Sequence, residues 1–169
     1  MNVVLLVDGY NVIGASPKLK ALKNVDFHAA REQLIRDMAE YQSFKGWKVI
    51  IVFDAHLSPG IEKKSKQSRV EVIYTREKET ADERIEKLVS QYMNVKTNVY
   101  VATSDLTEQW TIFSQGALRM SARELLTEIS QINRQISTKI KETKQTNQRS
   151  RIVLPEEIRD YFEKLRRGK

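Results

Sequence analysis

The sequence predicts an α/β sandwich in which a mostly parallel central sheet lies between two layers of helices. The first observation is a set of three continuous apolar runs, rich in β-branched residues, over residues 3–7, 49–53 and 99–102. Runs of this length and composition are typical of strands that are buried on both faces. The second observation is that segments with a helical spacing of apolar residues separate these runs, and strands that alternate with helices form parallel sheets.

Each element in the first half of the chain has its own local signal. Asp26 can cap a helix after the first strand, and Gly46 fits just past the end of that helix. After the second strand, residues 69–74 mix alternation with β-branched side chains, which predicts a strand nearer an edge of the sheet. Residues 80–83, Thr-Ala-Asp-Glu, form a capping box that begins the next helix.

After the third apolar run, three helical segments are expected. One lies between residues 105 and 116, and a second capping box, Ser-Ala-Arg-Glu at residues 121–124, begins another. Residues 143–151 are polar and basic with no apolar period, so we expect a flexible stretch there. Pro155 then fits the first turn of a last, short helix. The expected order is therefore β-α-β-β-α-β-α-α-α.

Positive charge is concentrated at the end of the chain. The 169 residues include 29 Lys or Arg and 22 Asp or Glu, which gives a net charge of +7. Eleven basic and five acidic residues fall in the last 36 positions, so this tail carries +6 and the body is nearly neutral. We expect a first domain at residues 1–135 and a basic helical extension at residues 136–169, packed on that domain or trailing from it. A basic tail suits a polyanionic partner.

The composition excludes several kinds of site. The chain has no cysteine and only two histidines, which excludes disulfides, thiolate metal sites and histidine-rich zinc centres. It contains neither the Gly-x-x-x-x-Gly-Lys nor the Gly-x-Gly-x-x-Gly pattern, so no organic cofactor is expected. The first apolar run is only five residues long and follows no basic segment, so we expect neither a signal peptide nor a membrane span, and a cytoplasmic protein.

Four aspartates follow the predicted strands. Asp8, Asp54 and Asp105 come after the three apolar runs, and Asp82 lies in the first turn of the helix after the remaining strand. Ligands of open α/β sheets bind beyond the carboxyl ends of the strands, so we expect these acids to converge. Two carboxylates about 4 Å apart repel one another by roughly 4 kcal/mol at an effective dielectric near 20. A divalent cation removes this repulsion, and oxygen ligands favour Mg²⁺ or Mn²⁺, which indicates metal-assisted cleavage of phosphodiester bonds.

Each acid also has a purely structural explanation. Asp82 can complement the dipole of its helix, Asp105 can be an N-cap, and Asp54 can cap a turn. Asp8 is the hardest to explain in this way, because it follows five apolar residues and precedes a glycine. The prediction of a metal site therefore rests on the set of four.

The same residues resemble the motifs of a known family. Val-Asp-Gly-Tyr-Asn at residues 7–11, Val-Phe-Asp at 52–54, Thr-Ala-Asp at 80–82 and Thr-Ser-Asp at 103–105 are similar, in this order, to the motifs of NYN domains. NYN domains are a branch of the PIN-like ribonucleases, and the resemblance is greatest to their bacterial YacP-like group. It covers about residues 1–135 and continues into the basic tail.

The resemblance implies a PIN/NYN-like three-layer sandwich and an endoribonuclease that depends on Mg²⁺ or Mn²⁺. Its acidic metal-binding set would be Asp8, Asp82 and Asp105. Asn11 matches the family asparagine near the metal, and Asp54 matches a further acid that supports the site from its margin. YacP-like members are linked to cleavage of messenger RNA on the ribosome, so the resemblance also implies RNA and the ribosome as partners.

Further residues are candidates for RNA contacts. Four cations fall within seven residues, at Lys63, Lys64, Lys66 and Arg69. This segment is either a solvated loop or, if it opens at the edge that carries the acids, a binding site for phosphates. Tyr10 can stack on a base or pack in the core, and Arg84 can reach a phosphate or pair with a glutamate. We expect His56 in a turn or substrate contact and not as a general base, and Trp47 and Trp110 in the core. The tail can be a solvated helix, an RNA-binding arm or a ribosome anchor.

Two other functions compete with an endoribonuclease. An aspartate-based phosphatase of the haloacid dehalogenase type would need a second aspartate two residues after Asp8, where this chain has Tyr10. An RNA- or ribosome-binding module without catalysis would keep the basic tail, but it would not need Asp8, Asp82 and Asp105 together.

Overall fold

The computed structural model describes residues 2–57, 69–104 and 114–152, together with residues 110, 112 and 166; of residues 145–152 it gives only the helical main chain. Contacts along the chain divide it into two compact units, residues 1–130 and residues 131–169. The central sheet and the candidate site belong to the first unit.

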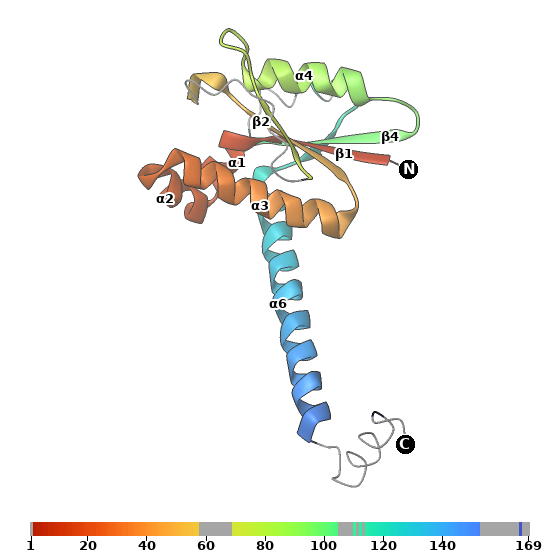
Figure 1. Ribbon diagram of the computed structural model, residues 1–169. Coiled ribbons are helices and arrows are strands. Elements are labelled where there is room, and N and C mark those ends of the chain that lie inside the picture. Colours follow the sequence, from red (N-terminus) through yellow and green to blue (C-terminus); the bar gives the residue numbers. More distant parts are fainter. Residues whose placement is uncertain are drawn as a thin grey trace. The chain divides into compact units, whose positions relative to one another are not determined.

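Five parallel strands form the sheet of the described residues, in the order β3-β2-β1-β4-β5 (Figure 1). The strands are β1 (Asn2–Asp8), β2 (Lys48–Phe53), β3 (Glu71–Tyr74), β4 (Thr97–Ala102) and β5 (Leu118–Met120). The predicted parallel α/β sheet is confirmed, and β3 lies at an edge as its sequence pattern indicated. The sequence did not predict β5, because a three-residue strand with two exposed side chains leaves no apolar run.

Helices cover both faces of this sheet, α4 on one face and α1, α2 and α3 on the other (Figure 1). Their bounds are α1 (Gly9–Ala15), α2 (Pro17–Val25), α3 (Phe27–Lys45) and α4 (Ala81–Tyr92). Val4 and Leu6 of β1 pack in one core cluster with Ile85 of α4. Leu5 and Val7 are also fully buried, and they contribute to the opposite core layer because successive side chains of a strand point to opposite faces. The three-layer sandwich is therefore confirmed.

Local capping chemistry sets the helix ends where the sequence indicated. Asp26 Oδ1 accepts a hydrogen bond from His28 N at 2.9 Å at the start of α3, and Gly46 ends that helix with a φ of +70°. Thr80 Oγ1 caps α4 in the same way through Glu83 N. Helices α1 and α2 were not predicted, although Ser16 followed by Pro17 is a good start signal and Ser16 Oγ does accept from Leu19 N.

The predicted flexible stretch at residues 143–151 is wrong. Helix α6 (Ala122–Ile152) begins after Ser121, whose Oγ accepts a hydrogen bond from Glu124 N at 3.0 Å, and it continues through the whole stretch. Lys, Gln, Glu and Arg are good helix formers, and no glycine or proline interrupts the chain before Pro155, so helix propensity extends α6 without an apolar face. The short helix expected after Pro155 lies outside the described residues. That the segment 136–169 packs on the first domain stays a prediction.

The two tryptophans differ in their surroundings. Trp47 is half-buried and stacks on Tyr100, with ring centroids 5.2 Å apart. Trp110 is 83% exposed, so its predicted place in the core is wrong. The hydrophobicity of a single residue does not determine which side of its segment faces the core.

No helix among the described residues combines the length and apolarity that crossing a membrane would require.

Candidate active site

The carboxyl ends of all five strands meet at one edge of the sheet, because the strands are parallel. Asp8 ends β1 beside Val52 of β2, and Asp54 follows β2 directly. Only six residues connect β3 to α4, so the first turn of α4, with Asp82, begins at this same edge. The fold thus brings Asp8, Asp54 and Asp82 to one edge, as predicted. Asp105 follows Ser104 and lies outside the described residues.

Asp8 is a buried acid, with 8% of its surface exposed. It occupies the N-cap position of α1, yet its side chain makes no capping hydrogen bond there. Helix capping therefore does not explain this aspartate. The next residue must be glycine, because a side chain at Gly9 would collide with the ring of Phe53. Gly9 lets α1 begin immediately after β1 and places Asp8 at the helix N-terminus, where the helix dipole favours the ionised carboxylate.

Asn11 joins the first strand–helix junction to the end of β4. Its Oδ1 accepts two hydrogen bonds from Ser104, one from the main-chain N at 2.6 Å and one from Oγ at 2.8 Å. Because N–H and O–H groups donate to this oxygen, the amide NH₂ of Asn11 is directed elsewhere and stays a donor. The structure thus places Asn11 at the site, and it fixes the residue immediately before Asp105.

Asp54 shapes the turn after β2. Its Oδ1 accepts a hydrogen bond from His56 N at 2.8 Å, which is the turn-capping role kept open above. His56 itself is exposed. The neighbouring Ala55 N donates to Thr75 Oγ1 at 2.8 Å, and Thr75 is only 1% exposed. Thr75 was not singled out from the sequence, although its place directly after a predicted strand was a usable signal; it ties the ends of β2 and β3 together.

An ion cluster around the buried carboxylate of Glu79 anchors the start of α4, next to Asp82. Glu79 is 6% exposed, and its two carboxylate oxygens accept from Arg84 and Lys87, each at 2.7 Å. Burial alone would raise the pKa of Glu79, but the hydrogen bonds from Arg84 and Lys87 outweigh it and hold that pKa at about 2. Sequence reasoning missed Glu79. The guanidinium of Arg84 is engaged by this carboxylate, which corrects the proposed phosphate contact in favour of the structural alternative.

Tyr10 belongs to the core. It is 7% exposed, and its ring contacts Phe53 at 5.0 Å and Phe27 at 6.0 Å between centroids. Arg31 Nη1 donates to the Tyr10 hydroxyl at 3.2 Å, and the hydroxyl donates to the Leu57 carbonyl at 3.4 Å. A ring enclosed in this way offers no face to a base, so the expectation that Tyr10 stacks on RNA is wrong. The buried Arg31 had no sequence signal, since its tyrosine partner is 21 residues away.

Of the four cations in the predicted basic segment, the structure describes only Arg69. Lys63, Lys64 and Lys66 lie outside the described residues. Arg69 is exposed, and its carbonyl accepts from Gln42 Nε2 at 3.1 Å just before β3 begins. The start of β3 is at the amino edge, opposite Asp8, so the main chain of Arg69 is not at the edge that carries the acids. The expectation that the whole segment opens at that edge is therefore corrected for Arg69.

The donor chemistry at the carboxyl edge fits a hard divalent cation. Asp8 and Asp82 supply carboxylate oxygens, and Asn11 holds the residue before the third acid, Asp105. Within the described ranges, which exclude Asp105, no group of three or more acidic, histidine or cysteine side chains is gathered tightly enough to hold a metal ion. All-oxygen ligands of this type suit Mg²⁺ or Mn²⁺ and not the softer metals.

A parallel sheet between two helical layers, with acids at its carboxyl edge, is an α/β sandwich consistent with the PIN-like fold. The chain belongs to the family of YacP-like NYN domains, which it matches over residues 5–167. It is 57% identical over 165 residues to the YacP protein of Bacillus subtilis strain 168, covering 98% of this chain and 97% of that protein.

Two crystal structures of Rae1 (YacP) from Bacillus subtilis are similar to this chain. One is 57% identical, with a TM-score of 0.78, and the match covers 98% of this chain and 95% of the other. The second, of a point mutant in which leucine replaces a tryptophan, is 56% identical with a TM-score of 0.74, and it covers 83% of this chain and 82% of the other. Family and relatives together support a nuclease-like, RNA-related function.

Proposed function

We propose that the protein is an endoribonuclease that requires Mg²⁺ or Mn²⁺ and cuts RNA at the carboxyl edge of its sheet. Asp8 carries the proposal: it is a buried carboxylate at a strand end that performs no capping role. Turn capping accounts for Asp54, and the helix dipole can account for Asp82, but capping does not account for Asp8. A cation site gives a chemical reason for a buried acid at this strand end.

Asp8, Asp82 and Asp105 would hold the cation. When bound, it supplies charge for the scissile phosphate and lowers the pKa of an attacking water. Asn11 contributes by fixing Ser104 and by keeping its amide donor available for a carboxylate or a phosphate oxygen. Asp54 supports the margin of the site through its turn, and the Glu79 cluster fixes the helix turn that carries Asp82.

Messenger RNA on the ribosome is the proposed substrate, with the protein acting in the cytoplasm. The support for this part is the resemblance of residues 1–135 to YacP-like NYN domains together with the basic tail. RNA as the substrate class is supported further by family membership. Ribosome dependence predicts that free RNA of the same sequence is cut more slowly than RNA on translating ribosomes.

The test is incubation of labelled messenger RNA, free and on translating ribosomes, with Mg²⁺ or Mn²⁺. We expect cleavage by the wild type and at least about a hundredfold loss of rate in Asp82→Asn, as is usual when a charge that stabilises the reacting centre is removed. Glu83→Gln is the matched control, because it removes the same charge from the neighbouring exposed position. Equal cleavage by Asp82→Asn and Glu83→Gln would refute the catalytic role. RNA binding without any cleavage by the wild type would favour the binding module instead.

A further inference from the structure

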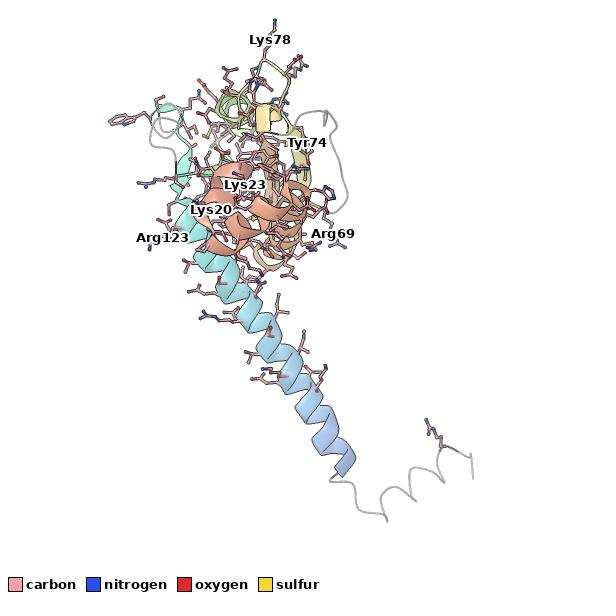
Figure 2. All side chains as sticks on the ribbon, turned by 90° about the vertical axis from the view of Figure 1, so that its left-hand side faces the viewer. Lys20, Lys23, Arg69, Tyr74, Lys78 and Arg123 are labelled. Carbon is pink, nitrogen blue, oxygen red and sulfur yellow. The ribbon has the colours of Figure 1, made fainter. Side chains whose placement is uncertain are left out.

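Helix α2 presents a basic surface on the side of the fold at which β1 ends. Residues 16–25 contain three lysines and no acidic residue. Lys20 and Lys23 are three positions apart and therefore share one side of the helix. Figure 2 views the molecule from the side on which β1 ends in Figure 1, and it shows both side chains on that side. This surface lies on the same side of the fold as Asp8.

Among the described residues, no carboxylate neutralises Lys20 or Lys23. Neither forms an ion pair within the part of the chain that the structure describes. Lys18 differs, because it lies near Asp37: burial raises the pKa of Asp37, and the positive charge of Lys18 acts against that rise. The remaining two lysines have no such carboxylate among the described residues, so a polyanion would be their natural counter-charge.

An exposed aromatic ring completes this surface. Phe27 is 40% exposed, and Lys23 Nζ lies 5.2 Å from its ring centroid. The same ring contacts Tyr10 edge-on, at 6.0 Å between centroids, and Tyr10 is two residues from Asp8. A short packed path therefore connects the basic surface to the carboxyl edge. A lysine next to a partly exposed aromatic ring is a usual element of a single-strand binding site, where phosphates meet cations and bases stack.

We propose that Lys20, Lys23 and Phe27 form a subsite for the substrate strand, in which the lysines bind RNA phosphates and Phe27 contacts a base. The inference rests on the proposed function, since it takes RNA as the substrate. It also answers a physical difficulty of that function: the acids repel a polyanion, so cations beside them are needed to bring the strand to the edge. Tyr10, which is enclosed, cannot supply the stacking surface; Phe27 can.

The test uses a fluorescently labelled single-stranded RNA of about twelve nucleotides and the full chain, with anisotropy measured in EDTA so that no cleavage occurs. Lys20→Ala/Lys23→Ala should weaken binding at least about tenfold at low salt and reduce the slope of log affinity against log salt by about 1.4, since each phosphate contact contributes about 0.7. Phe27→Leu should weaken binding about fivefold or more without changing that slope. Lys48→Ala/Lys96→Ala removes the same charge at the amino edge and should bind as the wild type does.

Binding by Lys20→Ala/Lys23→Ala that equals that of the control pair, or a wild type that does not bind this RNA at low salt, would overturn the subsite. Melting temperatures of all variants guard against misfolding. The proposed function fails separately: a wild type that binds RNA through these lysines but cuts none with Mg²⁺ or Mn²⁺, free or on ribosomes, would retain the subsite and remove the catalysis.

Discussion

One oxygen atom of Asn11 accepts both hydrogen bonds that Ser104 donates to it, across 93 positions of the chain. This contact joins the start of α1 to the segment that follows β4. Asp8 precedes α1 at the end of β1, and the segment after β4 leads to Asp105. The contact makes Asn11 a positioning residue for the carboxyl edge as well as a candidate for contact with a phosphate. Because Ser104 donates from two different atoms, the contribution of each hydrogen bond to stability can be measured separately.

Asn11→Ala should destabilise the protein by about 1–2 kcal/mol, because it leaves the Ser104 N–H without its acceptor. Ser104→Ala removes only the hydroxyl bond and should cost about 0.5–1 kcal/mol. Urea denaturation of both variants and the double variant measures the coupling between them. A Ser104→Ala variant as unstable as Asn11→Ala would show that the main-chain hydrogen bond contributes nothing, and an uncoupled pair would show that the hydroxyl hydrogen bond contributes nothing.

The Glu79 cluster should make stability depend on pH in the acid range. The pKa of Glu79 falls from its usual 4.5 to about 2 in the fold. A carboxyl group with a lowered folded-state pKa stabilises the fold fully above pH 4.5, and this contribution is lost as the pH falls toward 2. The contribution is on the order of 1–3 kcal/mol, because solvent screens the largely exposed Lys87. Glu79→Gln should lose this dependence.

Denaturation measured between about pH 7 and pH 3 compares the wild type with Glu79→Gln. The difference in unfolding free energy should be largest near neutral pH and shrink steadily below pH 4.5. Glu83→Gln, which changes an exposed neighbour, should follow the wild-type curve. A wild-type advantage that is independent of pH would contradict the buried ion cluster.

Asp82 should contribute repulsion in the absence of metal. Asp82→Asn is therefore expected to leave the metal-free protein at least as stable as the wild type, despite the loss of a favourable helix-dipole interaction of about 0.3–1 kcal/mol. Saturating Mg²⁺ should stabilise only the wild type, by about 2.7 kcal/mol at a hundredfold excess over Kd. Thermal denaturation with and without Mg²⁺ measures both effects. A marked loss of metal-free stability in Asp82→Asn would show that the acid serves mainly to start the helix.

Tyr10→Phe tests the assignment of this ring to the core. The variant removes the hydroxyl that accepts from Arg31, so it should be less stable by about 1 kcal/mol. RNA binding should be unchanged, because the ring stays between Phe27 and Phe53. The check is anisotropy alongside urea denaturation. Weaker RNA binding with unchanged stability would show that Tyr10 contacts RNA.

Local patterns predicted those parts of the fold that depend on local chemistry. The apolar runs located β1, β2 and β4, and capping residues such as Asp26 and Thr80 located helix starts, because strand burial and capping involve residues close in sequence. The acids were found because a parallel sheet places its strand ends together. Short elements such as α1 and β5 were missed, since a helix of seven residues and a strand of three residues are too short to show a periodic pattern of apolar side chains.

The remaining parts of the site depend on partners that only the folded chain brings together. Arg31 and Tyr10 are 21 residues apart and lie on different helices, so no spacing rule links them. Glu79 and Arg84 are close in sequence, yet the pattern did not show that Glu79 is buried and paired with Arg84. The exposure of Trp110 is likewise set by the tertiary packing around it and not by its hydrophobicity.

The central claim is that Asp8 holds a divalent cation for RNA cleavage. Its most direct test is the single-turnover rate of cleavage of messenger RNA on translating ribosomes by wild type and Asp8→Asn, measured as Mn²⁺ is titrated into metal-depleted samples. We expect the wild-type rate to rise with Mn²⁺ and saturate, whereas Asp8→Asn stays at least about a hundredfold slower at every concentration while still binding RNA. A wild-type rate that is independent of Mn²⁺ and Mg²⁺, or an Asp8→Asn rate equal to that of the wild type, would contradict the claim.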